Sequence, residues 1–254
     1  MYERIRIKKL ADSIYLLDDY GEATGYLVTG SERAAVIDTM NGIEDVHAVV
    51  RAITDLPLVL INTHGHCDHI FGNIYFDEAC MNPADNTLAE EQTQRKEFLD
   101  LCRATNRKLP PFKPVNDGDT INLGNLTLKV IALPGHTTGG ICLLLEEKRI
   151  LFTGDSINHH LWMQLDECLP LSVFLENLKR ISFVKTKADR ILHGHAQDFD
   201  DISLYDELVD GVQDLITTGG KGDGIFDYAY KWMTGKCRQH PFGNGSVICY
   251  NKIK

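Results

Sequence analysis

The chain has 254 residues, 43% of them hydrophobic and 24% charged, with a formal net charge of −10, so nucleic-acid phosphates and anionic membranes are disfavoured as partners. No apolar run is long enough to span a bilayer, and the opening MYERIRIKKLADSIYLL is too charged for a signal peptide. The seven cysteines form no CxxC pair, which is typical of free thiols in a reducing compartment and predicts a cytoplasmic protein.

The first half of the chain is predicted to form short strands followed by a helix and another strand. Apolar alternation indicates strands over 13–18, 25–30 and 34–39, a helix over 43–54 and a strand over 56–62. The polar, helical pattern of residues 86–105 then indicates a surface excursion.

The second half repeats this order of elements. Strands are predicted within 119–133 and 140–155, the latter interrupted by a turn at EEKR, and they are followed by a helix over 171–183, a strand over 188–192 and a helix over 203–217. Two runs of strands with helices after them favour two packed sheets with helices outside, in one α/β domain over residues 1–254.

Four of the predicted strands end in residue types that bind metals. LVLIN is followed by THGHCDH (63–69), LKVIAL by PGH (134–136), RILFT by GD (154–155) and DRIL by HGH (193–195). Functional groups in layered α/β folds gather where loops leave strand ends. Imidazole and carboxylate suit zinc, iron or manganese. Five histidines and two aspartates exceed the needs of one tetrahedral ion but suffice for two ions that share a carboxylate.

Each single motif has a second interpretation. His136 or His195 alone is as consistent with a turn or a cap as with a ligand, and Asp155 is also suited to capping a helix near Ser156. The heptad differs, because three imidazoles at this spacing would repel one another when protonated and match neither a helix face nor a strand face. The heptad therefore predicts a metal site and gives weight to the other three motifs.

THGHCDH, PGHT, GDS and HGH resemble the metallo-β-lactamase superfamily in order and spacing over nearly the whole chain. AAVIDT resembles its early strand, with Asp38 in the place of a residue that supports the histidine loop and Met40 where glycine is usual. The resemblance implies an αββα four-layer sandwich, with two mixed β-sheets flanked by helices. It also implies a first metal on His64, His66 and His136, a second on Asp68, His69 and His195, a bridge at Asp155, and no ligand role for His193.

The same resemblance implies hydrolysis by a hydroxide that bridges two divalent metal ions, zinc before iron or manganese, with Asp68 as catalytic proton carrier. The motifs are similar to those of hydroxyacylglutathione hydrolases and homoserine-lactone lactonases, whose heptad continues toward a Gly-Asn pair, here IFGN. We therefore expect a small-molecule substrate: a thioester, a lactone or another ester. A phosphodiesterase, an iron enzyme resembling persulfide dioxygenases, and a metal-binding sensor without turnover are the alternatives.

The segment 156–167 leaves Asp155 and so must pass near the metal site. His159, His160 and Trp162 are candidates for substrate binding, with a solvated loop and a core-buried Trp162 as the alternative. Cys67 is interpreted as a spacer that faces away from the metals. The C-terminal segment ends in an apparent strand, and the sequence indicates neither its role nor an oligomeric state.

Overall fold

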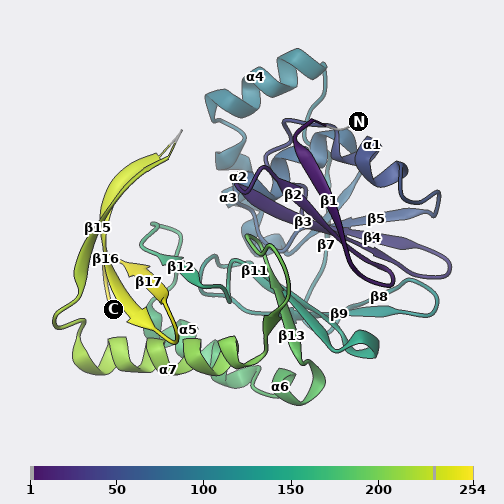
Figure 1. Cartoon of the computed structure of the whole chain (residues 1–254). Coiled ribbons are helices and arrows are strands. Elements are labelled where there is room, and N and C mark those ends of the chain that lie inside the picture. The colour runs from purple at the N-terminus through teal and green to yellow at the C-terminus, as the bar shows by residue number, and fades with distance from the viewer. Residues whose placement is uncertain (1–2, 231–232, 254) are drawn as a thin grey trace.

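Two mixed sheets form the centre of the protein, in a computed structural model that describes residues 3–230 and 233–253 (Figure 1). The first sheet runs in sequence order through β1 (Ile5–Ala11), β2 (Ile14–Asp19), β3 (Ala23–Thr29), β4 (Ala34–Ile37), β5 (Leu58–Ile61), β6 (Ala79–Met81) and β7 (Phe112–Pro114). Pairing is antiparallel from β1 to β4 and parallel from β4 to β7.

The second sheet has the order β14-β13-β11-β10-β9-β8. Its strands are β8 (Thr120–Asn122), β9 (Thr127–Ala132), β10 (Ile141–Leu145), β11 (Ile150–Gly154), β13 (Arg190–His193) and β14 (Asp200–Asp201). Only β11 and β13 pair in parallel. The predicted turn at EEKR is the short helix η3 (Glu146–Lys148) between β10 and β11.

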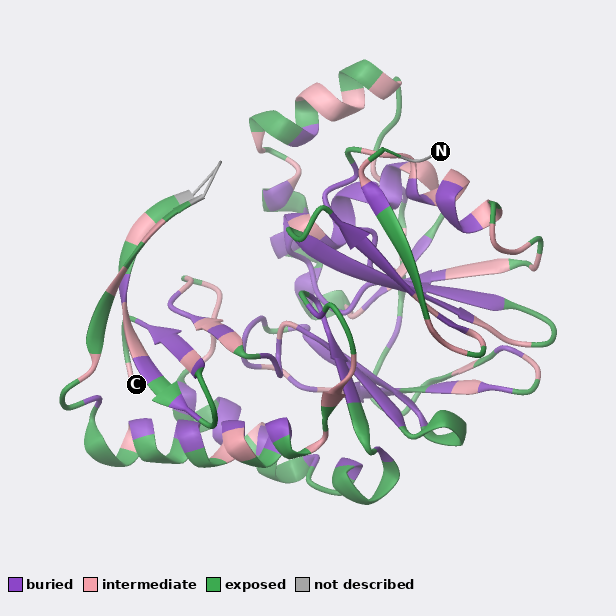
Figure 2. Cartoon of the chain, viewed as in Figure 1, coloured by how far each residue is buried: buried purple, intermediate pink, exposed green. Residues whose placement is uncertain are grey.

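The two sheets pack face to face, and helices cover their outer faces. Ile37 and Ile61 of the first sheet share a buried core with Leu143 and Phe152 of the second. Helix α1 (Val46–Arg51) covers the first sheet, and α5 (Leu171–Arg180) and α7 (Ser203–Thr218) cover the second. Figure 2 shows that most strands of the two sheets are buried, whereas β1 at the edge of the first sheet is largely exposed. This arrangement confirms the predicted αββα sandwich. Each sheet packs against the other sheet on its inner face and against helices on its outer face, which explains why many of its strands are apolar throughout.

A third sheet, which the sequence did not predict, packs against α7. It has the order β12 (His160–Met163), β17 (Ser246–Tyr250), β16 (Met233–Phe242) and β15 (Gly224–Tyr230), and only β17 matches the expected C-terminal strand. Phe242, Ile248 and Tyr250 contact the same core as Val212 and Leu215 of α7. The sheet therefore extends from the second half of the sandwich (Figure 1).

Several predicted boundaries differ from the structure. Helix α1 begins only after Asp45, whose carboxylate caps it by accepting from the Ala48 N–H at 2.9 Å. The predicted excursion contains two helices, α3 (Asn86–Gln92) and α4 (Lys96–Thr105). The remaining short helices are α2 (Cys67–Ile70), η1 (Phe71–Tyr75), η2 (Pro83–Asp85) and α6 (Val184–Lys187). Among the described residues, no helix has the length and apolar character needed to cross a bilayer.

Candidate metal centre

Asp38, just after β4, holds the histidine loop that follows β5. Its Oδ1 accepts from the Thr63 N–H at 2.8 Å, and its Oδ2 accepts from the Thr63 hydroxyl at 2.7 Å and from His69 Nδ1 at 2.8 Å. The supporting role expected of Asp38 is thus visible in its contacts. Met40 has φ 58°, a left-handed conformation that favours glycine, and its buried side chain packs in the core beneath α1.

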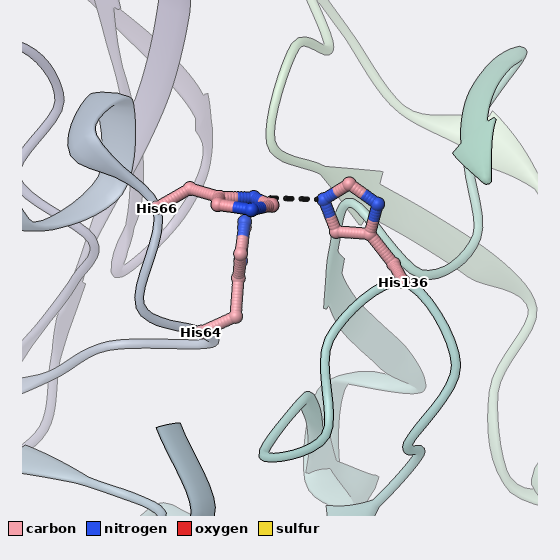
Figure 3. Close-up of side chains that lie close together, drawn as sticks. All are labelled: His64, His66 and His136. Atoms are coloured by element: carbon pink, nitrogen blue, oxygen red, sulfur yellow. Dashed lines mark hydrogen bonds between the residues drawn. The ribbon is translucent and has the colours of Figure 1, made fainter. Parts of the chain in front are cut away.

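Three histidines of the predicted first group lie together. His64 and His66 come from the loop after β5, and His136 comes from the loop after β9. One ring nitrogen of each lies within 4.8 Å of the others, and all three residues are buried. Figure 3 shows the His66 and His136 rings approaching each other from two separate loops.

Hydrogen bonds outside the group fix which nitrogen of each ring carries a proton. His136 Nδ1 donates to the Trp162 carbonyl at 2.6 Å, and His66 Nε2 donates to Glu167 Oε1 at 2.6 Å. The Thr63 hydroxyl already donates to Asp38, so it accepts from His64 Nδ1 at 3.0 Å. In each neutral ring the other nitrogen therefore has a lone pair and no proton.

These lone pairs point at one another. His136 Nε2 and His66 Nδ1 are 3.0 Å apart, and His64 Nε2 is buried with no hydrogen-bond partner. Two lone pairs at this distance repel unless a cation lies between them. Burial lowers the pKa of His136 to about 4 and, together with neighbouring imidazoles, lowers that of His64, so these two rings are neutral at neutral pH. The group fits a metal ion.

The second group contains Asp68, His69, Asp155 and His195, whose ligand atoms also lie within 4.8 Å of one another. His195 donates through Nδ1 to the Glu22 carbonyl at 3.0 Å, which leaves Nε2 facing Asp155 Oδ2 at 3.1 Å and Asp68 Oδ2 at 3.7 Å. His69 donates through Nδ1 to Asp38, and its Nε2 lies 3.5 Å from Asp155 Oδ1. Buried His69 Nε2 and Asp155 Oδ1 have no hydrogen-bond partner.

Electrostatics differ between the groups. Burial opposes a charged imidazolium, but the Asp155 carboxylate outweighs burial and raises the pKa of His195 to about 9. Burial also opposes the charged forms of His69 and Asp155. The neighbouring carboxylates nevertheless raise the pKa of His69, and the neighbouring imidazoles lower the pKa of Asp155. The second group therefore has the negative potential to bind a cation.

Asp155 lies between the two groups. Its Oδ2 is 3.9 Å from His136 Nε2 of the first group and 3.1 Å from His195 Nε2 of the second. Gly194 allows this approach, because a Cβ there would lie 2.3 Å from Asp155 Oδ1 and 2.5 Å from His69 Cε1. The structure thus brings together all seven residues expected from the sequence.

Two buried or half-buried carboxylates beside the first group were not predicted. Glu167 accepts from His66, as described above. Asp85 is fully buried and accepts from the Gly65 N–H at 2.9 Å, the Gly139 N–H at 2.5 Å and the Thr137 hydroxyl at 2.7 Å. It thereby joins the loop of His64 and His66 to the loop of His136. The sequence gives no signal for either carboxylate, because both contacts depend on the tertiary fold.

His193 belongs to a separate network with His159 and Asp200. Its Nδ1 accepts from the His195 N–H at 3.2 Å, so its Nε2 carries the proton and faces Asp200 Oδ2 at 3.2 Å. His159 bonds Ser246 Oγ at 2.8 Å and Asp200 Oδ1 at 2.9 Å. These three side chains are close enough to hold an ion, but the proton on His193 Nε2 favours a hydrogen-bond network.

Cys67 begins α2, and its thiol lies 3.9 Å from Asp68 Oδ1 of the second group. Its side chain also belongs to the buried cluster of Ile70, Phe71 and Phe98. Burial raises the pKa of the Cys67 thiol to about 12, which disfavours the thiolate that would bind a metal.

Two facing mixed sheets with helices outside and a histidine–aspartate centre in the loops that leave them define an αββα fold with a candidate metal site. A family model described as the metallo-beta-lactamase superfamily matches residues 19–222, and the chain belongs to this superfamily. The DIM-1 metallo-beta-lactamase matches with a TM-score of 0.63 at 18% identity over 84% of this chain and 98% of that chain. A metallo-beta-lactamase from Erythrobacter litoralis matches with a TM-score of 0.63 at 17% identity, over 85% of this chain and 99% of that chain. Identities this low support the fold alone.

Sequence relatives include named hydrolases. The acyl-coenzyme A thioesterase MBLAC2 of Gallus gallus is 29% identical over 206 residues, which cover 71% of this chain and 74% of that protein. Its Homo sapiens counterpart is 29% identical over 59% of this chain and 65% of that protein, slightly less than two thirds of its length. The hydroxyacylglutathione hydrolase of Chelativorans sp. (strain BNC1) is 30% identical over 49% of this chain and 43% of that protein.

Proposed function

We propose that this protein hydrolyses small thioesters with two divalent metal ions, which we assign as zinc. One observation carries the proposal: each of the five histidines donates one N–H to an oxygen outside the centre and turns its other nitrogen inward. A ring held in this way presents one nitrogen that binds a metal once any proton on that nitrogen has been released. His64, His66 and His136 would hold one ion, Asp68, His69 and His195 the other, and Asp155 would bridge.

Metal ions bound in these groups would lower the pKa of a water molecule and polarise the carbonyl of the substrate. Asp68 is the group that we assign to proton transfer. Its side chain is 25% exposed, whereas those of His69 and Asp155 are 0% and 12% exposed, so it borders both the centre and solvent. It would take a proton from the attacking water and pass it to the departing sulfur. The C–S bond breaks, a C–O bond forms, and the products are a carboxylic acid and a thiol.

The choice of thioesters rests on the relatives. The names of the acyl-coenzyme A thioesterases and the hydroxyacylglutathione hydrolase both describe removal of an acyl group from a thiol compound. We also propose a cytoplasmic location and a small-molecule substrate. All seven cysteines are free, as a reducing compartment allows, and the charge of −10 disfavours nucleic acid.

A panel of chromogenic thioesters, lactones and phosphodiesters tests the proposal. We expect thioester hydrolysis by the zinc-loaded protein, loss of it after chelation, and recovery on adding zinc. Asp155→Asn should bind less metal and lose most of the activity. Phosphodiester cleavage without thioester cleavage, or metal binding without turnover of any substrate, would contradict the proposal.

A further inference from the structure

The third sheet carries aromatic side chains on one face. Along β12, His160 and Trp162 are half-buried, whereas Leu161 and Met163 between and after them are buried in the core below. Along β15, Phe226 and Tyr228 are half-buried and Ile225 is 66% exposed. Because successive strand residues point to opposite sides, each strand presents two rings on the face away from α7.

The rings of β12 and β15 meet although the two strands form opposite edges of the sheet. Ring centroids are 5.4 Å apart for His160 and Phe226 and 5.1 Å apart for Trp162 and Tyr228. In a flat sheet, three strand spacings would separate them by about 14 Å. The sheet therefore curls, as the bend of β15 and β16 in Figure 1 shows, and the aromatic face is concave.

This face adjoins the metal centre. The carbonyl of Trp162 is the group that accepts from His136 Nδ1 at 2.6 Å, so the strand bearing two of the rings is bonded to the first ligand group. A substrate whose carbonyl lies at the centre can thus extend onto the rings.

The residues paired with these rings are uncharged. Trp162 pairs with Cys249, Cys249 with Gln239, and Phe226 with Cys237, and residues paired across strands point to the same side. Cys249 Sγ lies 3.0 Å from His160 Nε2. Asp227 and Lys236 pair with each other on the opposite side. Among the described residues, the concave face therefore suits an apolar group and offers no ion pair to a charged thiol carrier.

We propose that His160, Trp162, Phe226 and Tyr228 form a subsite for the acyl group of the substrate, an extended alkyl chain or an aryl group. The inference rests on the proposed thioester hydrolysis, and it specifies that the third sheet binds the acyl part of the substrate. A face made of such rings gains affinity with every methylene it covers, by about fourfold per methylene. The thiol part of the substrate lies outside this subsite.

Acyl-coenzyme A thioesters of two, four, eight and twelve carbons test the subsite. The kcat/KM of the wild-type protein should rise with chain length, and the ratio of the twelve-carbon to the two-carbon value should fall at least tenfold in Phe226→Ala and Tyr228→Ala. Ile225→Ala is the matched control, because it lies on the same strand with its side chain on the other face, and it should keep the wild-type ratio. Equal ratios in all four proteins would overturn the subsite.

Binding without turnover separates this inference from the proposed function. S-alkyl-coenzyme A thioethers cannot be hydrolysed, and calorimetry should find that their affinity rises with alkyl length in the wild type and not in Phe226→Ala. An affinity that is independent of alkyl length in the wild type would overturn the subsite even if thioesters are cleaved. Length-dependent affinity without cleavage of any thioester would support the subsite and contradict the proposed hydrolysis.

Discussion

Glu167 Oε1 lies 2.6 Å from His66 Nε2, a contact between residues 101 positions apart that decides which nitrogen of His66 faces the centre. The carboxylate is partly buried, and its hydrogen bond to His66 keeps the pKa of Glu167 low against the opposing effect of burial. The charged acceptor therefore holds the ring with its Nδ1 lone pair directed at His136.

Replacing Glu167 should weaken the first metal site. We expect Glu167→Leu, which removes the acceptor, to lower metal affinity by about 10–100-fold, the usual cost of losing a hydrogen-bond partner behind a metal ligand. Glu167→Gln retains an acceptor oxygen and should lose less. Competition with a coloured chelator measures both affinities. Wild-type affinity in both variants would show that the contact does not orient His66.

Asp85 should contribute to the stability of the folded protein as well as to the geometry of the first group. Asp85→Ala leaves the Gly65 and Gly139 amides and the Thr137 hydroxyl without an acceptor, at a cost of about 1–3 kcal/mol for each buried donor. Urea unfolding of the metal-free proteins should therefore give a much lower free energy of unfolding for this variant. Asp12→Ala, at a side chain that is 93% exposed, is the control and should change little. Equal stability of the two variants would contradict this role.

His193 and His195 should behave differently although only Gly194 separates them. His195→Ala removes an inward-facing nitrogen and should lose the second metal with nearly all hydrolysis. His193→Ala and Asp200→Asn disturb only the network behind that loop, so both should keep two metals and lose a smaller part of the activity. Elemental analysis and thioester assays compare the three variants. Metal loss in His193→Ala with retention in His195→Ala would reverse the assignment.

The seven centre residues could be found from sequence because they belong to short motifs rich in histidine and aspartate that come after apolar strands. Their positions depend on local sequence: His64 and His136 lie in the loops that leave β5 and β9. Glu167 and Asp85 could not be found in this way. Their roles come from approaches between loops that only the packed sheets create, and neither residue is in a motif.

The unpredicted strands share a physical cause. Most of β1 is exposed, with the burial pattern Beeeeii, so it lacks the alternation that marks a half-buried strand. Strands β15 and β16 carry exposed Asp227 and Lys236 on one side and aromatic or small residues on the other, and they follow three glycines, at 219, 220 and 222. Such strands show little alternation of apolar and polar residues in the sequence. Helix α7, which packs beneath the third sheet, has a clear apolar face.

The measurement that tests the central claim most directly is a zinc titration of the chelated protein, with bound metal and thioester hydrolysis recorded at each step. Two inward-facing ligand groups that share Asp155 predict binding of two equivalents per chain, with full activity only after the second. The Asp155→Ala variant should bind fewer than two equivalents of zinc per chain and should stay inactive. A wild-type value of one equivalent, unchanged by excess zinc and accompanied by full activity, would contradict the two-metal account.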